Sequence, residues 1–151
     1  MPMSMPELRE QLSSIEPDES TYAGLGPGDV PQLVALLADD EAWMAARAVY
    51  ALARIRSSQA RAALLKAAAY PRAEVRVALA SVAPDLPGHA SDSLLEQLLG
   101  DPDAGVRKFA IRSVSERNGP AVRAQLRKVA VEEEVPQLRA LAERVSKDLE
   151  K

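Results

Sequence analysis

The chain has 151 residues, of which 47% are hydrophobic, 27% are charged and only 3% are aromatic. This is the composition of one ordinary folded domain, which excludes a wholly disordered chain. Residues 1–41 carry nine acidic side chains and one basic one, residues 42–131 carry fourteen basic and seven acidic, and the net charge of the whole chain is −3. A basic middle between acidic ends can steer an acidic partner, although arginine-rich helices are also common as solvated surface.

The sequence has no cysteine and a single histidine, His89. The absence of cysteine removes disulfides, thiolate metal sites and a cysteine nucleophile, and one histidine does not make a metal site. We therefore expect no metal and no cofactor, and the serines have no companion base for a nucleophilic triad. No apolar stretch has the length of a bilayer span, so we expect a cytoplasmic protein with no membrane partner.

Residues 1–28 are predicted to form a capping segment. Ser4 followed by Glu7 is typical of a capping box, and apolar residues at helical spacing predict an amphipathic helix from about Pro6 to Ile15. Proline, glycine and acidic residues predict a loop from Glu16 to Asp29. We expect this helix to cover one end of a repeat array, with docking to another protein as the alternative.

A repeat of 31 or 32 residues occupies residues 29–150. In its clearest copy, Asp101 and Pro102 predict a helix start, and four apolar residues at helical spacing predict a buried face, namely Val106, Phe109, Ala110 and Val114. We number each repeat from the residue equivalent to Val106, which is position 0. The residues at position 0 are Met44, Val75, Val106 and Leu138.

Each repeat is predicted to be a pair of helices. First helices are expected to start at Asp29, Ser57-Ser58, Ser91-Asp92 and Asn118-Gly119-Pro120, and tight turns within the pairs are expected near Asp39, Tyr70, Asp101 and Glu132. The longest break within the array is expected at residues 84–90. Because one pair cannot bury its own apolar face, the pairs must stack, so we expect a single domain overall.

The order Leu-Leu, Asp-Pro-Asp, Val-Arg and Ala, which runs from Leu98 to Ala110, resembles the HEAT repeat family, particularly the short HEAT-like repeats named from phycobilisome lyases. The resemblance covers residues 29–150 and implies an all-α fold, an α-solenoid of about four HEAT-like helix pairs with an N-terminal capping helix. The first repeat departs from the pattern, since Ala45 stands at position 1, where the other repeats have arginine.

The resemblance also implies a role for the arginines at position 1, which are Arg76, Arg107 and Arg139. In HEAT-like proteins this arginine usually bonds an acid of a neighbouring turn and forms a ladder along the stack. Acids nearby in the sequence are Glu74, Asp103 and Glu133. The alternative is a clamp for a phosphate or carboxylate ligand.

A partner surface is expected on the concave side of the second helices, at positions 2, 5, 6 and 9 of each repeat. From these positions we predict a set of partner-binding residues, namely Val49, Tyr50, Val77, Lys108, Ile111, Arg112, Arg144 and Lys147. The first part of this surface is apolar and the second is basic, and apolar patches rimmed by charge are typical of protein interaction sites. The alternative is that the acidic segment around Glu16, Asp18 and Glu19 covers it.

These features favour a non-catalytic adaptor or scaffold that binds an acidic, amphipathic protein or peptide segment. The alternative is a nucleic-acid-binding protein that uses the basic middle of the chain. A third hypothesis is an enzyme of the family, either a HEAT-like lyase or a DNA glycosylase. The comparison with the glycosylases rests on Trp43 and the acids Asp39, Asp40 and Glu41.

Overall fold

The computed structural model describes residues 2–13 and 19–150, and these residues form helices joined by short turns. The helices, including the 3₁₀ turns η1 and η2, are α1 (Met5–Leu12), α2 (Glu19–Tyr22), η1 (Pro27–Asp29), α3 (Val30–Leu36), α4 (Ala42–Arg54), α5 (Ser58–Ala67), α6 (Ala73–Val82), η2 (Ala83–Asp85), α7 (Gly88–Leu98), α8 (Ala104–Ser113), α9 (Pro120–Glu132) and α10 (Pro136–Leu149). The described part of the chain contains no strand, which confirms the predicted all-α class. None of its helices combines the length and apolar character that a membrane span requires.

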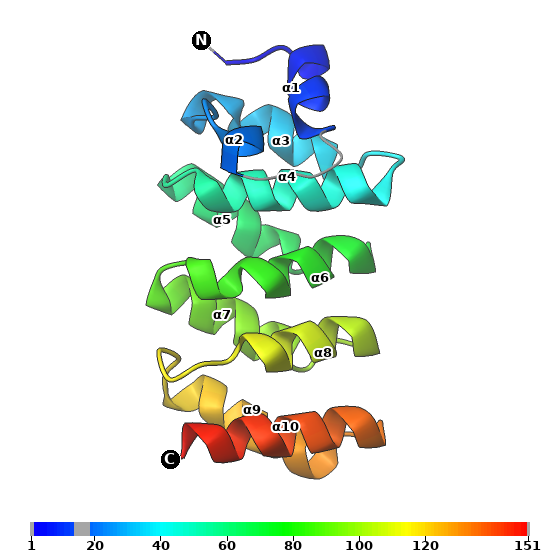
Figure 1. Ribbon diagram of the computed structural model, residues 1–151, viewed down its shortest axis with the longest axis vertical. Coiled ribbons are helices and arrows are strands. Elements are labelled where there is room, and N and C mark those ends of the chain that lie inside the picture. The colour runs from blue at the N-terminus through cyan, green and yellow to red at the C-terminus, as the bar shows by residue number, and fades with distance from the viewer. Residues whose placement is uncertain (1, 14–18, 151) are drawn as a thin grey trace.

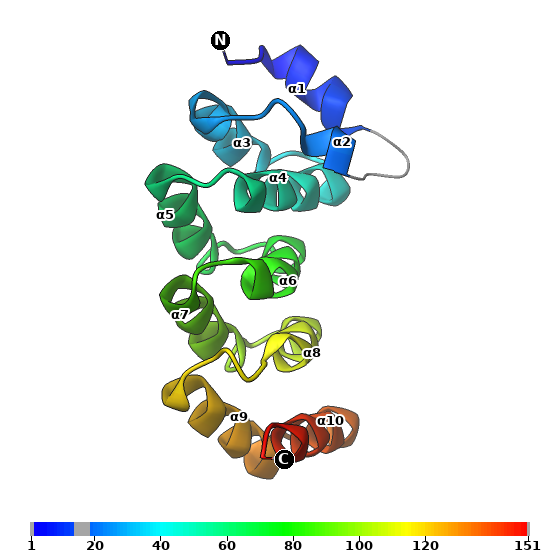
Figure 2. The same ribbon diagram turned by 60° about the vertical axis from the view of Figure 1, so that its left-hand side comes forward.

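From α3 onward the helices form the pairs α3–α4, α5–α6, α7–α8 and α9–α10, which follow one another along the long axis of the molecule (Figure 1). The second helices of the pairs form one row, in which α4 packs against α6, α6 against α8 and α8 against α10. The first helices form the other row, in which α5 contacts α7 and α7 contacts α9 (Figure 2).

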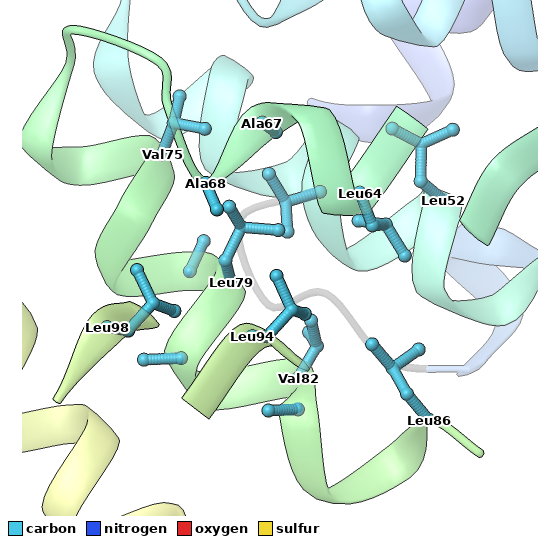
Figure 3. Close-up of a cluster of buried hydrophobic side chains, with 14 of the residues drawn as sticks. Leu52, Leu64, Ala67, Ala68, Val75, Leu79, Val82, Leu86, Leu94 and Leu98 are labelled. Carbon is cyan, nitrogen blue, oxygen red and sulfur yellow. The ribbon is translucent and has the colours of Figure 1, made fainter. Parts of the chain in front are cut away.

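Positions 0 and 4 of the repeat point into the space between the two rows. The four residues at position 4, which are Ala48, Leu79, Ala110 and Ala142, are 0% exposed, and those at position 0 are at most 7% exposed. They belong to one continuous core, because each helix buries its apolar face both against the other helix of its pair and against the neighbouring pairs. Figure 3 shows the middle of this core, where Leu52, Leu64, Leu79 and Leu94 lie together.

The helix α1 closes the N-terminal end of the stack. As predicted, it begins with a capping box, in which the Ser4 hydroxyl accepts from the Glu7 N–H (3.3 Å) and the Glu7 carboxylate accepts from the Ser4 N–H (3.3 Å). Its two leucines, Leu8 and Leu12, are 0% exposed. Arg47 of α4 donates to the Leu12 carbonyl oxygen (2.5 Å), so α1 is tied to the second helix of the first pair.

Several predicted helix boundaries agree with the structure. The Ser57 hydroxyl accepts from the Ala60 N–H (3.1 Å) at the start of α5, and Pro120 is the first residue of α9. The four turns within pairs also lie where they were predicted. The start of α7 was placed too late, because the helix begins at Gly88 rather than at Ser91.

Other local predictions are wrong. The predicted loop from Glu16 to Asp29 contains α2 and η1, although its first three residues, like Ile15, lie outside the described residues. The predicted break at residues 84–90 is mostly helical, because Pro84 is accommodated in the first turn of η2. Phe109, expected in the core, is 36% exposed.

The start of α8 differs from the prediction in an informative way. The helix begins at Ala104, and its N-cap is Asp103, whose carboxylate accepts from the Val106 N–H (3.0 Å). Asp101, the predicted cap, instead accepts from the Asp103 N–H (2.9 Å) and turns toward Arg76 of the preceding pair. Its side chain therefore connects two helix pairs rather than capping a helix.

Candidate binding surface

The second-helix row exposes positions 2 and 6 of the repeat but buries position 5. Val49, Ala80 and Ile111, the position 5 residues of α4, α6 and α8, are each 0% exposed. Position 5 lies one helical turn after position 1, whose arginines reach the following pair, so both positions face that pair. The placement of Val49 and Ile111 on the partner surface is therefore wrong.

An apolar cleft of about 380 Å³ lies between α4 and α6, and we call it the α4–α6 cleft. Its lining residues are Ala42, Trp43, Ala46, Tyr50, Ala73, Glu74, Val77 and Ala78. Tyr50 and Val77, both predicted as partner-binding residues, are half-buried here and line the same cleft. The only charged residue among the lining residues is Glu74.

A second cleft, of about 360 Å³, lies two helices further along the row, between α8 and α10, and we call it the α8–α10 cleft. Its lining residues are Ala104, Gly105, Lys108, Arg112, Val135, Gln137, Leu138, Leu141 and Arg144. Lys108, Arg112 and Arg144, all predicted, lie exposed around this largely apolar cleft. Among the described residues, no carboxylate forms an ion pair with any of these three side chains. The cleft therefore offers positive charge beside apolar surface.

The structure adds one residue to the predicted surface and separates another from it. Trp43 is 43% exposed in the α4–α6 cleft, and the guanidinium of Arg47 lies 4.9 Å from its ring centroid. Trp43 stands one residue before position 0. The residues at the same place in the other repeats, Glu74, Gly105 and Gln137, also line these clefts, so the repeat numbering could have identified Trp43 as a surface residue. Lys147 is exposed on α10 but lines neither cleft.

Two ion pairs connect successive helix pairs. The Nε and Nη2 atoms of Arg76 donate to the Asp101 carboxylate (2.8 and 3.1 Å), and those of Arg107 donate to the Glu133 carboxylate (2.7 and 3.0 Å). The expected ladder therefore exists at two arginines, but Arg76 pairs with Asp101 and not with Glu74. Because Asp101 and Glu133 are both nearly buried, these arginines are structural residues and not a ligand clamp.

The Arg107 guanidinium lowers the pKa of the Glu133 carboxyl below its ordinary value of 4.5, chiefly through their hydrogen bonds. Since the folded state favours the ionised carboxyl, the ion pair stabilises the fold above the pKa of the unfolded chain, and this contribution is lost as the pH falls through the lowered pKa. We expect the difference in unfolding free energy between the wild type and Glu133→Gln to be constant above about pH 5 and to shrink below it. Urea unfolding between pH 7 and pH 3 measures this difference, and a constant value over the whole range would contradict the prediction.

A third cleft, of about 590 Å³, lies at the C-terminal ends of α4 and α6, and three arginines line it, namely Arg54, Arg56 and Arg117. The Arg117 guanidinium donates to the carbonyl oxygens of Pro84 (2.6 Å) and Leu86 (3.4 Å). These bonds satisfy carbonyl groups at the end of the second pair, which gives Arg117 a structural role. This cleft is not evident from the sequence, because its residues come from three separate turns.

Within residues 2–13 and 19–150, no group of three or more His, Cys, Asp or Glu side chains is arranged to hold a metal ion. Trp43 and Asp39, which the glycosylase comparison paired, have separate roles: Trp43 lines the α4–α6 cleft, whereas Asp39 forms an ion pair with Arg9. No family model matches the chain, and no curated protein matches it.

Proposed function

We propose that this chain is a HEAT-like α-solenoid of about four helix pairs with an N-terminal capping helix, and that it acts as a non-catalytic adaptor in the cytoplasm. Its partner is a protein or peptide segment that is acidic and amphipathic. The repeated burial of positions 0 and 4 and the ion pairs between successive helix pairs support the solenoid. Because the proposed role is binding without catalysis, it requires no cofactor.

The observation that carries the proposal is that two clefts lie along the row of second helices, one between α4 and α6 and one between α8 and α10. The α4–α6 cleft presents Trp43, Tyr50 and Val77, and the α8–α10 cleft presents Lys108, Arg112 and Arg144 beside apolar residues. An apolar side chain of the partner occupies the first cleft, and its carboxylates lie against the second. Apolar burial then supplies most of the affinity, and charge sets the orientation and the association rate.

Two substitutions on this surface test the proposal. Tyr50→Ala removes an aromatic anchor and is expected to weaken binding by about 2 kcal/mol, or roughly thirtyfold in Kd. Arg112→Glu is expected to weaken it by about tenfold, with the larger effect at low salt. The partner is first identified by affinity purification of the wild-type protein from its native cell extract, and its affinity for each variant is then measured by titration calorimetry.

Matched variants keep this test specific. Tyr50→Phe retains the ring, and Lys66→Glu reverses a charge on the exposed surface of α5, away from both clefts. Both are expected to bind as the wild type does. If Tyr50→Ala and Arg112→Glu bind the purified partner as tightly as these controls, the partner does not use the two clefts.

Nucleic-acid binding is the second candidate, since the positive charge of residues 42–131 favours it. It predicts that the protein is retained on heparin and on duplex DNA, and that this retention falls steeply with salt. The pairing of Arg76 and Arg107 with carboxylates counts against it, because two of the basic charges are neutralised within the fold.

A further inference from the structure

Three arginines at position 1 share one arrangement, but within the part of the chain that the structure describes only two of them have a carboxylate partner. The Nη1 atoms of Arg76, Arg107 and Arg139 each donate to a carbonyl oxygen in the turn of their own pair, those of Tyr70 (2.7 Å), Asp101 (3.0 Å) and Glu133 (2.9 Å). In Arg76 and Arg107 the Nε and Nη2 atoms then bind an acid of the next pair. Among the described residues, Arg139 forms no ion pair.

A second observation concerns the residue seven positions before position 0, at the end of each first helix. In the first three pairs this residue is Leu37, Ala68 or Leu99, and it is 2%, 3% or 1% exposed. In the last pair it is Val131, which is 78% exposed. The turn end of α9–α10 thus retains both an arginine and an aliphatic residue of the kinds that contact the next pair elsewhere in the stack.

The rest of α10 lacks the apolar residues that α8 buries at the same repeat positions. Ile111 of α8 and Val114, which directly follows α8, are buried, whereas the equivalent residues of α10 are Glu143, which is exposed, and Ser146, which is half-buried. An apolar helix pair therefore does not match the whole C-terminal surface. A single short helix that contacts only the turn end would fit this surface. The opposite end of the stack has such an arrangement, because the single helix α1 lies there and forms an ion pair with the first helix pair through Arg9 and Asp39.

We propose that the turn end of α9–α10, formed by Val131 and Arg139, docks a helix of another protein that is followed by an Asp or Glu. Its carboxylate binds the Nε and Nη2 atoms of Arg139 in a bidentate pair, and an aliphatic residue one turn before the acid covers Val131. The chain itself contains the template: Val129 and Glu133, four residues apart, line one cleft with Leu99 and Arg107. This site is separate from the two clefts of the proposed function and does not depend on them.

The probe for this site is a fluorescein-labelled peptide that copies residues 120–135, which form α9 and the turn that carries Glu133. Its binding to the full-length protein is measured by fluorescence anisotropy. We expect Glu133→Gln in the peptide, or Arg139→Gln in the protein, to weaken binding by about tenfold, because each removes one partner of the same charge-assisted pair. The two changes together are expected to weaken it no further.

Two further variants test whether the peptide binds at this site, one within the site and one outside it. Val131→Ser changes an exposed side chain without disturbing the core and is expected to weaken peptide binding severalfold. Arg144→Gln removes a charge in the α8–α10 cleft and is expected to leave peptide binding unchanged, so the peptide assay tests this site independently of the proposed function. Thermal unfolding of each variant confirms that it is folded.

The remaining outcomes overturn the proposal. Equal affinity of the Glu and Gln peptides would show that the carboxylate is not part of the contact. Equal affinity of the wild type and Arg139→Gln would show that the peptide binds elsewhere, for example by exchange with α9 at Arg107. Absence of binding up to about 1 mM would show that this end accepts no such helix. A dimer in sedimentation equilibrium that Arg139→Gln abolishes would assign the site to a second copy of the chain.

Discussion

Replacing Arg107 by Gln is expected to lower the free energy of unfolding by about 3 kcal/mol, because it leaves the buried Glu133 carboxylate without its countercharge. The Arg107 side chain is 18% exposed and that of Glu133 only 4%, so solvent cannot replace the lost partner without local opening. Urea unfolding at pH 7, followed by far-ultraviolet circular dichroism, measures the loss.

The matched control for this prediction is Arg139→Gln. It removes an arginine at the same repeat position, with the same hydrogen bond to the turn carbonyl, but without a carboxylate partner in the described structure. We expect it to cost about 1 kcal/mol or less. Equal losses for Arg107→Gln and Arg139→Gln would mean that the ion pair with Glu133 contributes nothing to the stability of the stack.

Replacing Ile111 by Asp is expected to cost about 4 kcal/mol or more, which is enough to unfold a domain of ordinary stability. Ile111 is 0% exposed in the hydrophobic core, and Arg107, one helical turn earlier, is already paired with Glu133, so the new carboxylate would be buried without a countercharge of its own. The measurement is the circular dichroism of the purified variant at 25 °C together with its urea unfolding curve.

The adjacent Arg112 provides the comparison. Arg112 is exposed at the α8–α10 cleft, so Arg112→Asp is expected to change the unfolding free energy by no more than about 0.5 kcal/mol. A folded Ile111→Asp variant of wild-type stability would show that position 5 faces solvent, as the sequence pattern predicts, and would contradict the burial of Ile111 in the core.

The helix boundaries show which local signals are reliable. The helix-start signals at Ser4 with Glu7, at Ser57 and at Pro120 depend only on residues within one helical turn. Helices α1, α5 and α9 begin at these signals. The prediction failed at Asp101, which has the side chain of a helix cap but binds Arg76 from 25 residues earlier. Capping and ion pairing use the same carboxylate, and only the neighbouring pair decides between them.

The candidate site was predicted less completely than the fold. Tyr50, Val77, Lys108, Arg112 and Arg144 do line clefts on one row of helices. Val49 and Ile111 were misplaced because a single helix with a wide apolar stripe does not reveal which edge of that stripe meets the next helix pair. The sequence associates Trp43 only with the glycosylase hypothesis, whereas the structure places it in the apolar α4–α6 cleft.

The all-helical class, the repeat length and the core residues at positions 0 and 4 can be predicted from the sequence alone, because they follow from helical periodicity within each repeat. Three other properties required the packed structure: the burial of position 5, the pairing of Arg76 with Asp101 and of Arg107 with Glu133, and, among the described residues, the exposure of Val131 and the missing ion pair of Arg139. They depend on the distance and rotation between successive helix pairs, which are set by packing between residues about 30 positions apart.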